Sequence, residues 1–265
     1  MRRDLTAAPD LVRKRGTGPL RVQRPEYVDL RPPCNTACPA GENIQVWLAL
    51  AQAAKYRDAW LKILDDNPLP AVHGRVCYHP CETSCNRTHL DDAVSIHAVE
   101  RLLGDRALAE GWMPELGATT GKRVLIVGAG PSGLSAAYHL RRLGHTVEIR
   151  DAGPVAGGMM HFGIPAYRLP RDVLAAEVDR IQRMGVTITL EHRVQDLERE
   201  WADGGFDAVF VAVGAHLSKR VDIPATDAVR MIDALSYLRD VDRGAAPQLG
   251  RRVAIYGGGH TAMDA

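Results

Sequence analysis

Five cysteines lie in the first third of this 265-residue chain, and their spacing suits metal or redox chemistry. Two of them occur in CNTAC and three in GRVCYHPCETSC, with three residues between neighbours in each run. An odd number fits a disulfide framework poorly, whereas clustered thiolates are typical ligands of zinc and of iron–sulfur clusters. The candidate ligands are Cys34, Cys38, Cys77, Cys81 and Cys85.

A glycine-rich turn follows further along the chain, in RVLIVGAGPSGLSAAYHLRRLGHTVEIRD. The pattern predicts an apolar strand, a turn, a helix and a second apolar strand. Gly128, Gly130 and Gly133 form G-x-G-x-x-G, and Asp151 ends the second strand. The glycines permit the tight turn, the approach of a pyrophosphate and close helix–strand packing, while the carboxylate suits a ribose hydroxyl. The sequence therefore predicts a dinucleotide site.

A second turn of the same kind ends the chain, in GRRVAIYGGGHTAMDA. Gly257, Gly259 and Ala262 supply G-x-G-x-x-A. Two dinucleotide turns indicate two dinucleotides, most economically a flavin and a nicotinamide that exchange hydride. Because the helix after the second turn is cut short, we expect this sequence to be the N-terminal fragment of a longer protein, and we do not expect the fragment alone to turn over.

The elements that position the cysteines are predicted to be helices. Residues 43–64 carry apolar side chains at three-to-four spacing, with a break near Lys55, and a further helix begins at a cap formed by Asp91 or Asp92. We expect an N-terminal arm over residues 1–33 and a helical, cysteine-bearing domain over residues 34–115.

Composition excludes several function classes. The formal net charge is +1, which offers no basic footprint for nucleic acid or an anionic membrane. No apolar run reaches the length of a signal peptide core or a membrane span. We therefore expect a cytoplasmic protein without a nucleic-acid or membrane partner.

Several segments together resemble one known family. The run RDAGPVAGGMMHFGIPAYRLPRDVL, with FDAVFVAVGAHLSKRVDIP downstream and the cysteine segments upstream, resembles the small (beta) subunit of glutamate synthase. Related proteins include the N-terminal electron-input part of dihydropyrimidine dehydrogenase and the NADPH-side subunit of the bifurcating transhydrogenase. The resemblance covers residues 34–265.

The resemblance implies an α/β architecture. A small α-helical iron–sulfur domain is followed by a Rossmann-like FAD-binding domain over residues 116–247. Residues 248–265 then begin a second, NAD(P)-binding Rossmann-like domain, which the sequence truncates.

The resemblance also implies the cofactor-binding residues. For FAD they are Gly128, Ala129, Gly130, Pro131, Ser132, Gly133, Asp151, Gly157, Gly158, Met159, Arg168 and Val194. For NADPH or NADH they are Gly257, Gly258, Gly259, His260 and Thr261. The strand VFVAV leads to a turn in which Val213 stands in the middle position of the family's ATG-type motif.

The cysteines match the family pattern only in part. Relatives usually carry enough cysteines for two [4Fe–4S] clusters, but here Glu26 and Asp29 occupy the places of two thiols. By resemblance, one cluster takes Cys38, Cys77, Cys81 and, from the next helix, Glu100. The other cluster retains only Cys34 and Cys85, and carboxylates are hard ligands for soft iron–sulfur chemistry. We expect one cluster, with the second absent or unstable.

Other interpretations of the cysteines stay open. They include a structural zinc site and buried, inert thiols. A flavin-linked dithiol reductase is excluded, because its cysteine pair would follow the first glycine turn and no cysteine follows Cys85. Three histidines, His73, His79 and His97, lie near the cysteines in sequence. Each is either a hydrogen-bond donor to the cysteine ligands or an ordinary structural histidine.

The implied function is electron input. Hydride passes from NAD(P)H to FAD, and electrons then pass to a [4Fe–4S] cluster and a partner, such as the glutamate synthase large subunit. The alternatives are the input part of a dihydropyrimidine dehydrogenase, a ferredoxin-linked reductase, and an FAD-binding scaffold with a structural zinc module. No catalytic acid or base is required for this chemistry.

Overall fold

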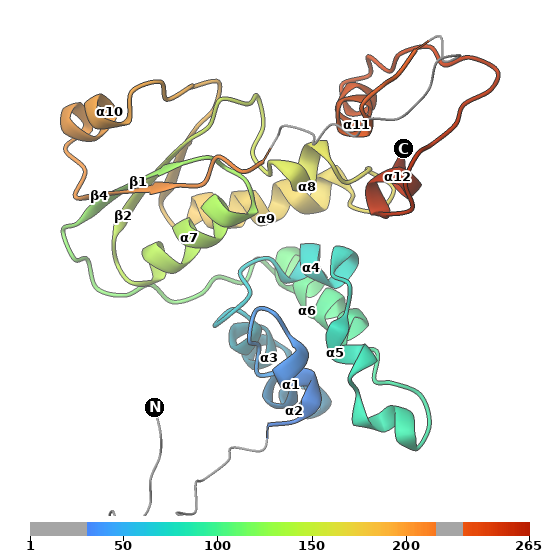
Figure 1. The fold of residues 1–265 in the computed structure, drawn as a ribbon. Coiled ribbons are helices and arrows are strands. Elements are labelled where there is room, and N and C mark those ends of the chain that lie inside the picture. Colours follow the sequence, from blue (N-terminus) through green and yellow to red (C-terminus); the bar gives the residue numbers. More distant parts are fainter. Residues whose placement is uncertain (1–30, 216–229) are drawn as a thin grey trace, which may run out of the picture.

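The computed structural model describes residues 31–215 and 230–265 of the chain. A bundle of short helices is followed by a parallel sheet with helices on its faces (Figure 1). The predicted arm lies almost entirely outside the described residues, as do Glu26 and Asp29. None of the helices in the described ranges combines the length and apolar character needed to cross a bilayer.

Apolar side chains at helical spacing build the first part. Trp47 and Trp60 are fully buried at its centre. The helix is interrupted between these two tryptophans, where Ala54 takes a positive φ of 58°. The predicted break near Lys55 is confirmed. The helices are α1 (Pro33–Ala37), α2 (Ile44–Gln52), α3 (Tyr56–Ile63), α4 (Pro70–Val76), α5 (Pro80–Thr83), the 3-10 helix η2 (Asn86–His89) and α6 (Ile96–Glu110).

The last helix of this part begins later than predicted. Ser95 is the residue before its first turn, so the prediction of a cap at Asp91 or Asp92 was wrong. Asp91 is instead held by Arg87, four residues earlier, with Nε–Oδ1 and Nη2–Oδ2 distances of 2.6 and 2.5 Å. The helix begins at Ile96, four residues after Asp92, so neither aspartate stands at its N-cap position.

The second part is a four-stranded parallel sheet in the order β3-β2-β1-β4. This order is that of a dinucleotide-binding half-fold, in which ligands bind at the carboxyl ends of the strands. Its elements are β1 (Arg123–Val127), α7 (Pro131–Arg142), β2 (Thr146–Arg150), α8 (Met159–Phe162), α9 (Arg171–Arg183), β3 (Val186–Thr189), α10 (Leu197–Gly204) and β4 (Ala208–Val211).

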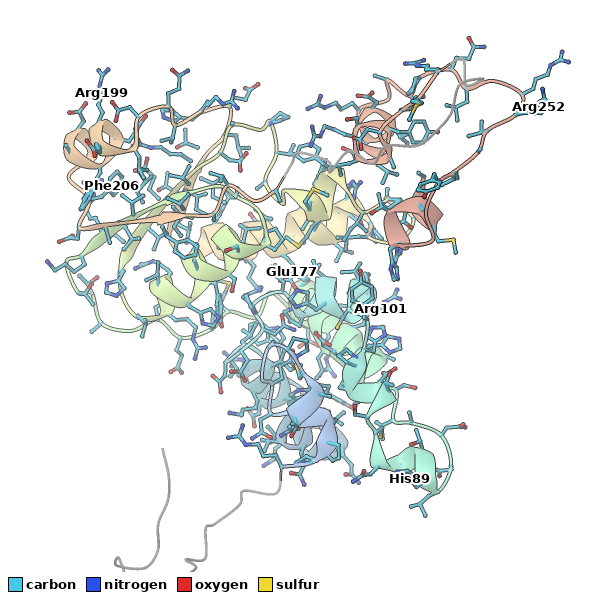
Figure 2. The ribbon with its side chains drawn as sticks, viewed as in Figure 1. His89, Arg101, Glu177, Arg199, Phe206 and Arg252 are labelled. Carbon is cyan, nitrogen blue, oxygen red and sulfur yellow. The ribbon has the colours of Figure 1, made fainter. Side chains whose placement is uncertain are left out.

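The layers share one continuous core. Helices α7 and α9 lie between the sheet and the helical bundle (Figure 1). Val124 and Ile126 of β1 belong to the same apolar cluster as Trp60, whereas Leu125 and Val127, on the other face, pack with Phe206. The core therefore crosses the predicted domain boundary near residue 115. Figure 2 shows Glu177 of α9 at the junction of the two parts.

The C-terminal segment adds α11 (Ala234–Asp242) and α12 (His260–Asp264). Gly257 takes a positive φ of 135° and Gly259 precedes the first turn of α12, as a dinucleotide turn requires. Within the described residues, no strand leads into this turn. A strand needs a hydrogen-bonded neighbouring strand. The sheet has β4 as one edge strand, and the segment before the second glycine turn does not pair with it.

Candidate functional site

The first glycine turn lies where β1 ends and α7 begins. Gly128 has a φ of 114°, and a side chain there would overlap the carbonyl oxygen of Ala212 at the end of β4. A side chain on Gly133 would overlap the carbonyl of Gly128. At Gly130, in contrast, an added Cβ would meet nothing closer than 3.9 Å. Two glycines thus serve packing, and the third leaves open space above the turn.

A second glycine pair closes over this space. The N–H of Gly157 donates to the carbonyl of Ala129 at 2.8 Å, which joins the GGM segment to the first turn. Gly158 has a φ of 53°, and a Cβ on it would lie 2.8 Å from the Cα of Gly130. The backbone of Gly130 and the ring of Pro131 border Gly158, and no side chain caps the N-terminus of α7. Open space facing unpaired N–H groups fits a pyrophosphate.

Asp151 lies beside the turn, directly after β2. Its two carboxylate oxygens accept hydrogen bonds from the N–H groups of Ala129 at 2.6 Å and Gly153 at 2.7 Å. The carboxylate therefore fixes the backbone on both sides of the space above Gly130. Its role toward a ribose stays a prediction.

The other residues predicted to bind FAD fall in four places. Pro131 and Ser132 are exposed at the start of α7, and Met159 begins α8 beside the second glycine pair. Val194 packs against the small cluster on the other face of the sheet. Arg168 follows α8, and its Nη1 atom lies 2.8 and 3.0 Å from the two carboxylate oxygens of Asp264 in α12.

The two cysteine runs lie side by side. Cys34 lies in α1, Cys38 ends α1, and Cys81 lies in α5. The contact between α1 and α5 brings both runs together. The division of the thiols between two clusters, which the resemblance implies, stays a prediction.

Backbone N–H groups surround the sulfur of Cys38. Those of Ala40, Gly41 and Glu42 interact with it, in a turn where Gly41 takes a φ of 76°. A ring of N–H groups favours a thiolate and the sulfurs of a cluster. In the same way, the N–H of His79 donates to the sulfur of Cys77 at 3.4 Å.

Burial keeps several thiols protonated in the absence of a metal. It raises the pKa of Cys34 and of Cys38, and it raises the pKa of Cys81 to about 12, together with neighbouring Glu82 and Cys77. A metal that binds here must displace these protons, which couples assembly of the site to pH.

Glu100 is buried in α6, beside the amide of Asn67. Asn67 Nδ2 donates to Glu100 Oε1 at 2.7 Å and to Glu42 Oε1 at 3.0 Å. Burial and the neighbouring carboxyl of Glu42 raise the pKa of Glu100 well above its ordinary value, and burial raises that of Glu42 to about 7. Asn67 occupies Oε1 of Glu100, and the ligand role of this carboxylate stays a prediction.

His73 joins the same network from α4. Its Nδ1 lies 2.7 Å from Oδ1 of Asn67, which also accepts from the N–H of Leu69 at 3.0 Å. Burial lowers the pKa of His73, so the ring is neutral and donates its proton to Asn67. This places His73 among structural histidines.

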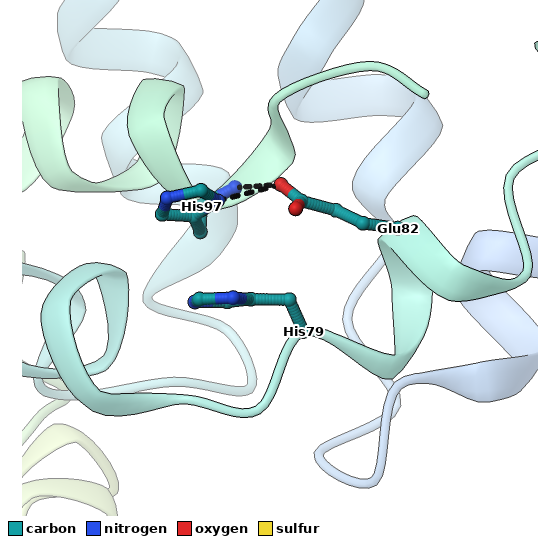
Figure 3. Close-up of side chains that lie close together, drawn as sticks. All are labelled: His79, Glu82 and His97. Atoms are coloured by element: carbon teal, nitrogen blue, oxygen red, sulfur yellow. Dashed lines mark hydrogen bonds and ion pairs between the residues drawn. The ribbon is translucent and has the colours of Figure 1, made fainter. Parts of the chain in front are cut away.

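His79, Glu82 and His97 form a compact trio beside the cysteines (Figure 3). Their ligand atoms lie within 4.8 Å of one another. Glu82 Oε1 accepts from Nδ1 and from the N–H of His97, at 2.7 and 3.0 Å. The two rings are stacked, with centroids 3.9 Å apart and planes at 23°. A metal binds in the plane of an imidazole, so one ion cannot serve both rings in this arrangement.

This trio ties α5 to α6. Glu82 was not predicted, although it follows Cys81 directly; its carboxylate satisfies an N–H in the first turn of α6, whose own N-terminus lacks a side-chain cap. The link holds the helix of Cys81 against the helix of Glu100.

No three of the five thiols form a compact set. In residues 31–215 and 230–265, the trio just described is the only group of three potential ligands within 4.8 Å of one another. Sulfurs on one tetrahedral zinc ion lie about 3.8 Å apart, given a Zn–S bond of about 2.3 Å. Three thiols would therefore have to move closer together to hold one zinc ion.

The second glycine turn lies near both sites. The ring of His260, at the start of α12, packs edge-on against Tyr78 in the Cys77–Cys81 loop, with centroids 4.6 Å apart. Asp264, at the end of α12, pairs with Arg168. The turn therefore contacts the cysteine loop and the segment after α8.

Comparison with known proteins matches both parts of the chain. Residues 29–112 match the family described as dihydropyrimidine dehydrogenase domain II, 4Fe-4S cluster. Residues 122–265, more than half of the chain, match the pyridine nucleotide-disulphide oxidoreductase family. The chain belongs to this oxidoreductase family. The iron–sulfur and α/β character predicted from the motifs is confirmed, and the matched families imply FAD, NAD(P)H and an iron–sulfur cluster.

Several relatives of this oxidoreductase are subunits of larger enzymes. It is 38% identical over 259 residues to the NADP(+)-dependent formate dehydrogenase subunit beta of Moorella thermoacetica. It is 38% identical over 240 residues to the NADPH-Fe(3+) oxidoreductase subunit beta of Geobacter sulfurreducens. It is 32% identical over 282 residues to the NADPH glutamate synthase small chain of Escherichia coli. The predicted resemblance to the glutamate synthase group is confirmed.

The oxidoreductase spans only part of these relatives. The matches cover 88%, 88% and 93% of this chain, but 37%, 36% and 60% of the three relatives in the same order.

Proposed function

We propose that this chain is the electron-input part of an NAD(P)H-dependent flavin and iron–sulfur oxidoreductase. Residues 34–115 carry the cluster, residues 116–247 carry FAD, and residues 248–265 begin the nicotinamide-binding part. Bound FAD accepts a hydride from NAD(P)H and passes its electrons on singly, which a cluster can carry.

The observation that carries the proposal is the glycine turn at the N-terminus of α7, where Gly128, Gly130 and Gly158 keep the backbone free of side chains and the helix has no side-chain cap. This turn and the cysteine helices border one continuous core. The chain's own residues orient and shield the cofactors. Asp151 fixes the glycine turn, and the N–H groups around Cys38 favour a thiolate. No acid or base at the reacting atoms is needed, because electron transfer depends on distance and potential.

In this proposal Cys38, Cys77, Cys81 and Glu100 hold the cluster, while Cys34 and Cys85 leave a second set incomplete. A larger partner subunit in the cytoplasm, of the kind that the relatives' subunit names indicate, takes the electrons. The glutamate synthase large subunit is the partner we favour.

Anaerobic purification of the full-length protein tests the proposal. FAD, iron, acid-labile sulfide and zinc are measured in the same sample, and the flavin spectrum is followed after addition of NADPH or NADH. We expect FAD with about four irons and matching sulfide per chain, and bleaching of the flavin. Stoichiometric zinc without sulfide would instead support the scaffold with a structural zinc module.

A further inference from the structure

The carboxylate of Asp264 binds the segment that carries Arg168. Its two oxygens accept from Arg168 Nη1 at 3.0 and 2.8 Å, and Oδ1 also accepts from the hydroxyl of Tyr167 at 3.2 Å. Only 9% of the Asp264 side chain is exposed. We call these three residues the α12 clamp. An acidic side chain so close to a turn for an anionic nucleotide is unexpected unless a cation holds it.

The segment held by the clamp also makes local contacts of its own. The N–H groups of Arg168 and Leu169 both donate to the carbonyl of Pro165 at 3.0 Å, and Leu169 is fully buried. Arg171 donates to the carbonyl of Ile164 at 2.9 Å. A shift of Asp264 is therefore transmitted to a well-defined loop beside the second glycine pair.

The clamp uses one edge of the guanidinium. Both hydrogen bonds to Asp264 come from Nη1, so the Nε and Nη2 edge is directed elsewhere and suits a second anion. The resemblance assigns Arg168 to FAD, and the structure pairs it with Asp264. One guanidinium can do both.

We propose that Asp264 is a positioning residue: through Arg168 it fixes the nicotinamide-binding turn at α12 against the flavin-binding loop, and so sets the approach of the nicotinamide to the flavin. The inference rests on the proposed function for its kinetic consequence, but not for its structural one. Asp264 itself touches neither cofactor in this account.

The test compares Asp264→Asn and Asp264→Glu in the full-length, FAD-loaded protein. The matched control is Asp207→Asn, which removes another aspartate ion pair, with Lys122 at 2.7 Å, on an exposed part of the sheet. Amide hydrogen exchange of residues 164–169 is measured without nucleotide. Stopped-flow measurements then separate affinity for the oxidised nucleotide from the rate of flavin reduction at saturating NAD(P)H.

For Asp264→Asn we expect exchange in residues 164–169 to be at least about tenfold faster. Flavin reduction should slow by about tenfold or more while nucleotide affinity changes by less than about twofold, because only alignment is lost. Asp264→Glu should recover most of the rate, and Asp207→Asn should match the wild type.

Unchanged exchange in Asp264→Asn would overturn the inference whatever the cofactor chemistry. A rate equal to that of Asp207→Asn would also overturn it. If instead the flavin of the wild-type protein is not reduced by NAD(P)H, the proposed function fails. The hydrogen-exchange result then still shows whether Asp264 holds the segment of Arg168.

Discussion

Glu177 Oε1 accepts the N–H of Ala71 at 2.9 Å, and this bond joins the sheet layer to the cysteine-bearing helices. Glu177 lies in α9, and Ala71 lies in the first turn of α4. Arg180 lies three residues after Glu177. Its Nη2 donates to Oε2 of Glu177 at 2.7 Å and also to the carbonyl of Pro68. Both charged side chains are only 1% exposed. The acid faces a helix N-terminus, where it is stabilising.

A second pair of contacts fixes the same junction. The Tyr138 hydroxyl and the Arg142 guanidinium, both in α7, donate to the carbonyl of Leu64 at 3.0 and 2.9 Å. Leu64 ends α3, where free carbonyls favour such donors. Together these contacts join the cysteine helices to the helix that follows the glycine turn, as the proposed electron transfer between the two sites would require.

Replacement of Glu177 by Ala should strongly destabilise the protein. It leaves Arg180 buried without its carboxylate partner, which costs about 3–5 kcal/mol in the free energy of unfolding. Urea unfolding, followed by tryptophan fluorescence, measures the loss. The control Asp179→Ala removes an exposed ion pair with Arg183 on the same helix and should change stability by less than about 1 kcal/mol. Equal effects would show that the junction is not held by Glu177.

Gly130→Ala should separate folding from cofactor binding. A Cβ there meets no atom within 3.9 Å, so the fold should survive, but the methyl group occupies the space proposed for the pyrophosphate. We expect FAD affinity to fall at least about tenfold, or 1.4 kcal/mol, by fluorescence titration of the full-length protein. Gly250→Ala, where nothing lies within 4 Å, is the control. Undiminished FAD affinity in Gly130→Ala would place the cofactor elsewhere.

Two cysteine variants distinguish one cluster from two. Cys38→Ala should abolish cluster assembly, because it removes a thiol from the group with Cys77 and Cys81. Cys34→Ala should retain about four irons per chain, because its partner group is incomplete. Iron and sulfide analysis after anaerobic reconstitution measures both. Loss of all iron from both variants would show that this division of the ligands is wrong.

The titration of His161 tests the docking of α11. Burial lowers its pKa from the ordinary value of 6.5, while Asp242, whose carboxylate lies 3.1 Å away, raises it. The unfolded chain therefore takes up the proton first, and the free energy of unfolding falls as pH drops below 6.5 toward the folded pKa. In Asp242→Asn the pKa of His161 should fall further, measured by NMR of the ring protons. A rise in that variant would contradict the contact.

Much of the nucleotide site was predictable because its requirements are local. The spacing of the glycine turn marks both Gly128 and Gly133. A Cβ on Gly133 would strike the nearby carbonyl of Gly128, whereas a Cβ on Gly128 would strike the carbonyl of Ala212, which only the fold brings close. The strand and helix pattern around them fixed the placement of Asp151 as well. These features follow from periodicity and turn chemistry.

Contacts between distant segments were not predictable in the same way. Glu82 and Asp264 gained their partners only when α5 met α6 and when α12 met the loop after α8. The predicted cap at Asp91 or Asp92 was wrong because α6 begins only at Ile96, and Asp91 pairs with Arg87 instead. Arg168 shows the same limit: its motif did not indicate the ion pair with Asp264, and its predicted contact with FAD stays a prediction.

The central claim is that NAD(P)H, FAD and one iron–sulfur cluster are joined in series in this chain. Full-length protein, reconstituted anaerobically, is mixed with NAD(P)H and frozen for EPR while the flavin absorbance is recorded; dithionite reduction of the same sample gives the total cluster. We predict flavin bleaching with the EPR signal of one reduced [4Fe–4S] cluster, and no such signal in Cys38→Ala. Flavin bleaching with a cluster that only dithionite reduces, or with no cluster at all, would contradict the claim.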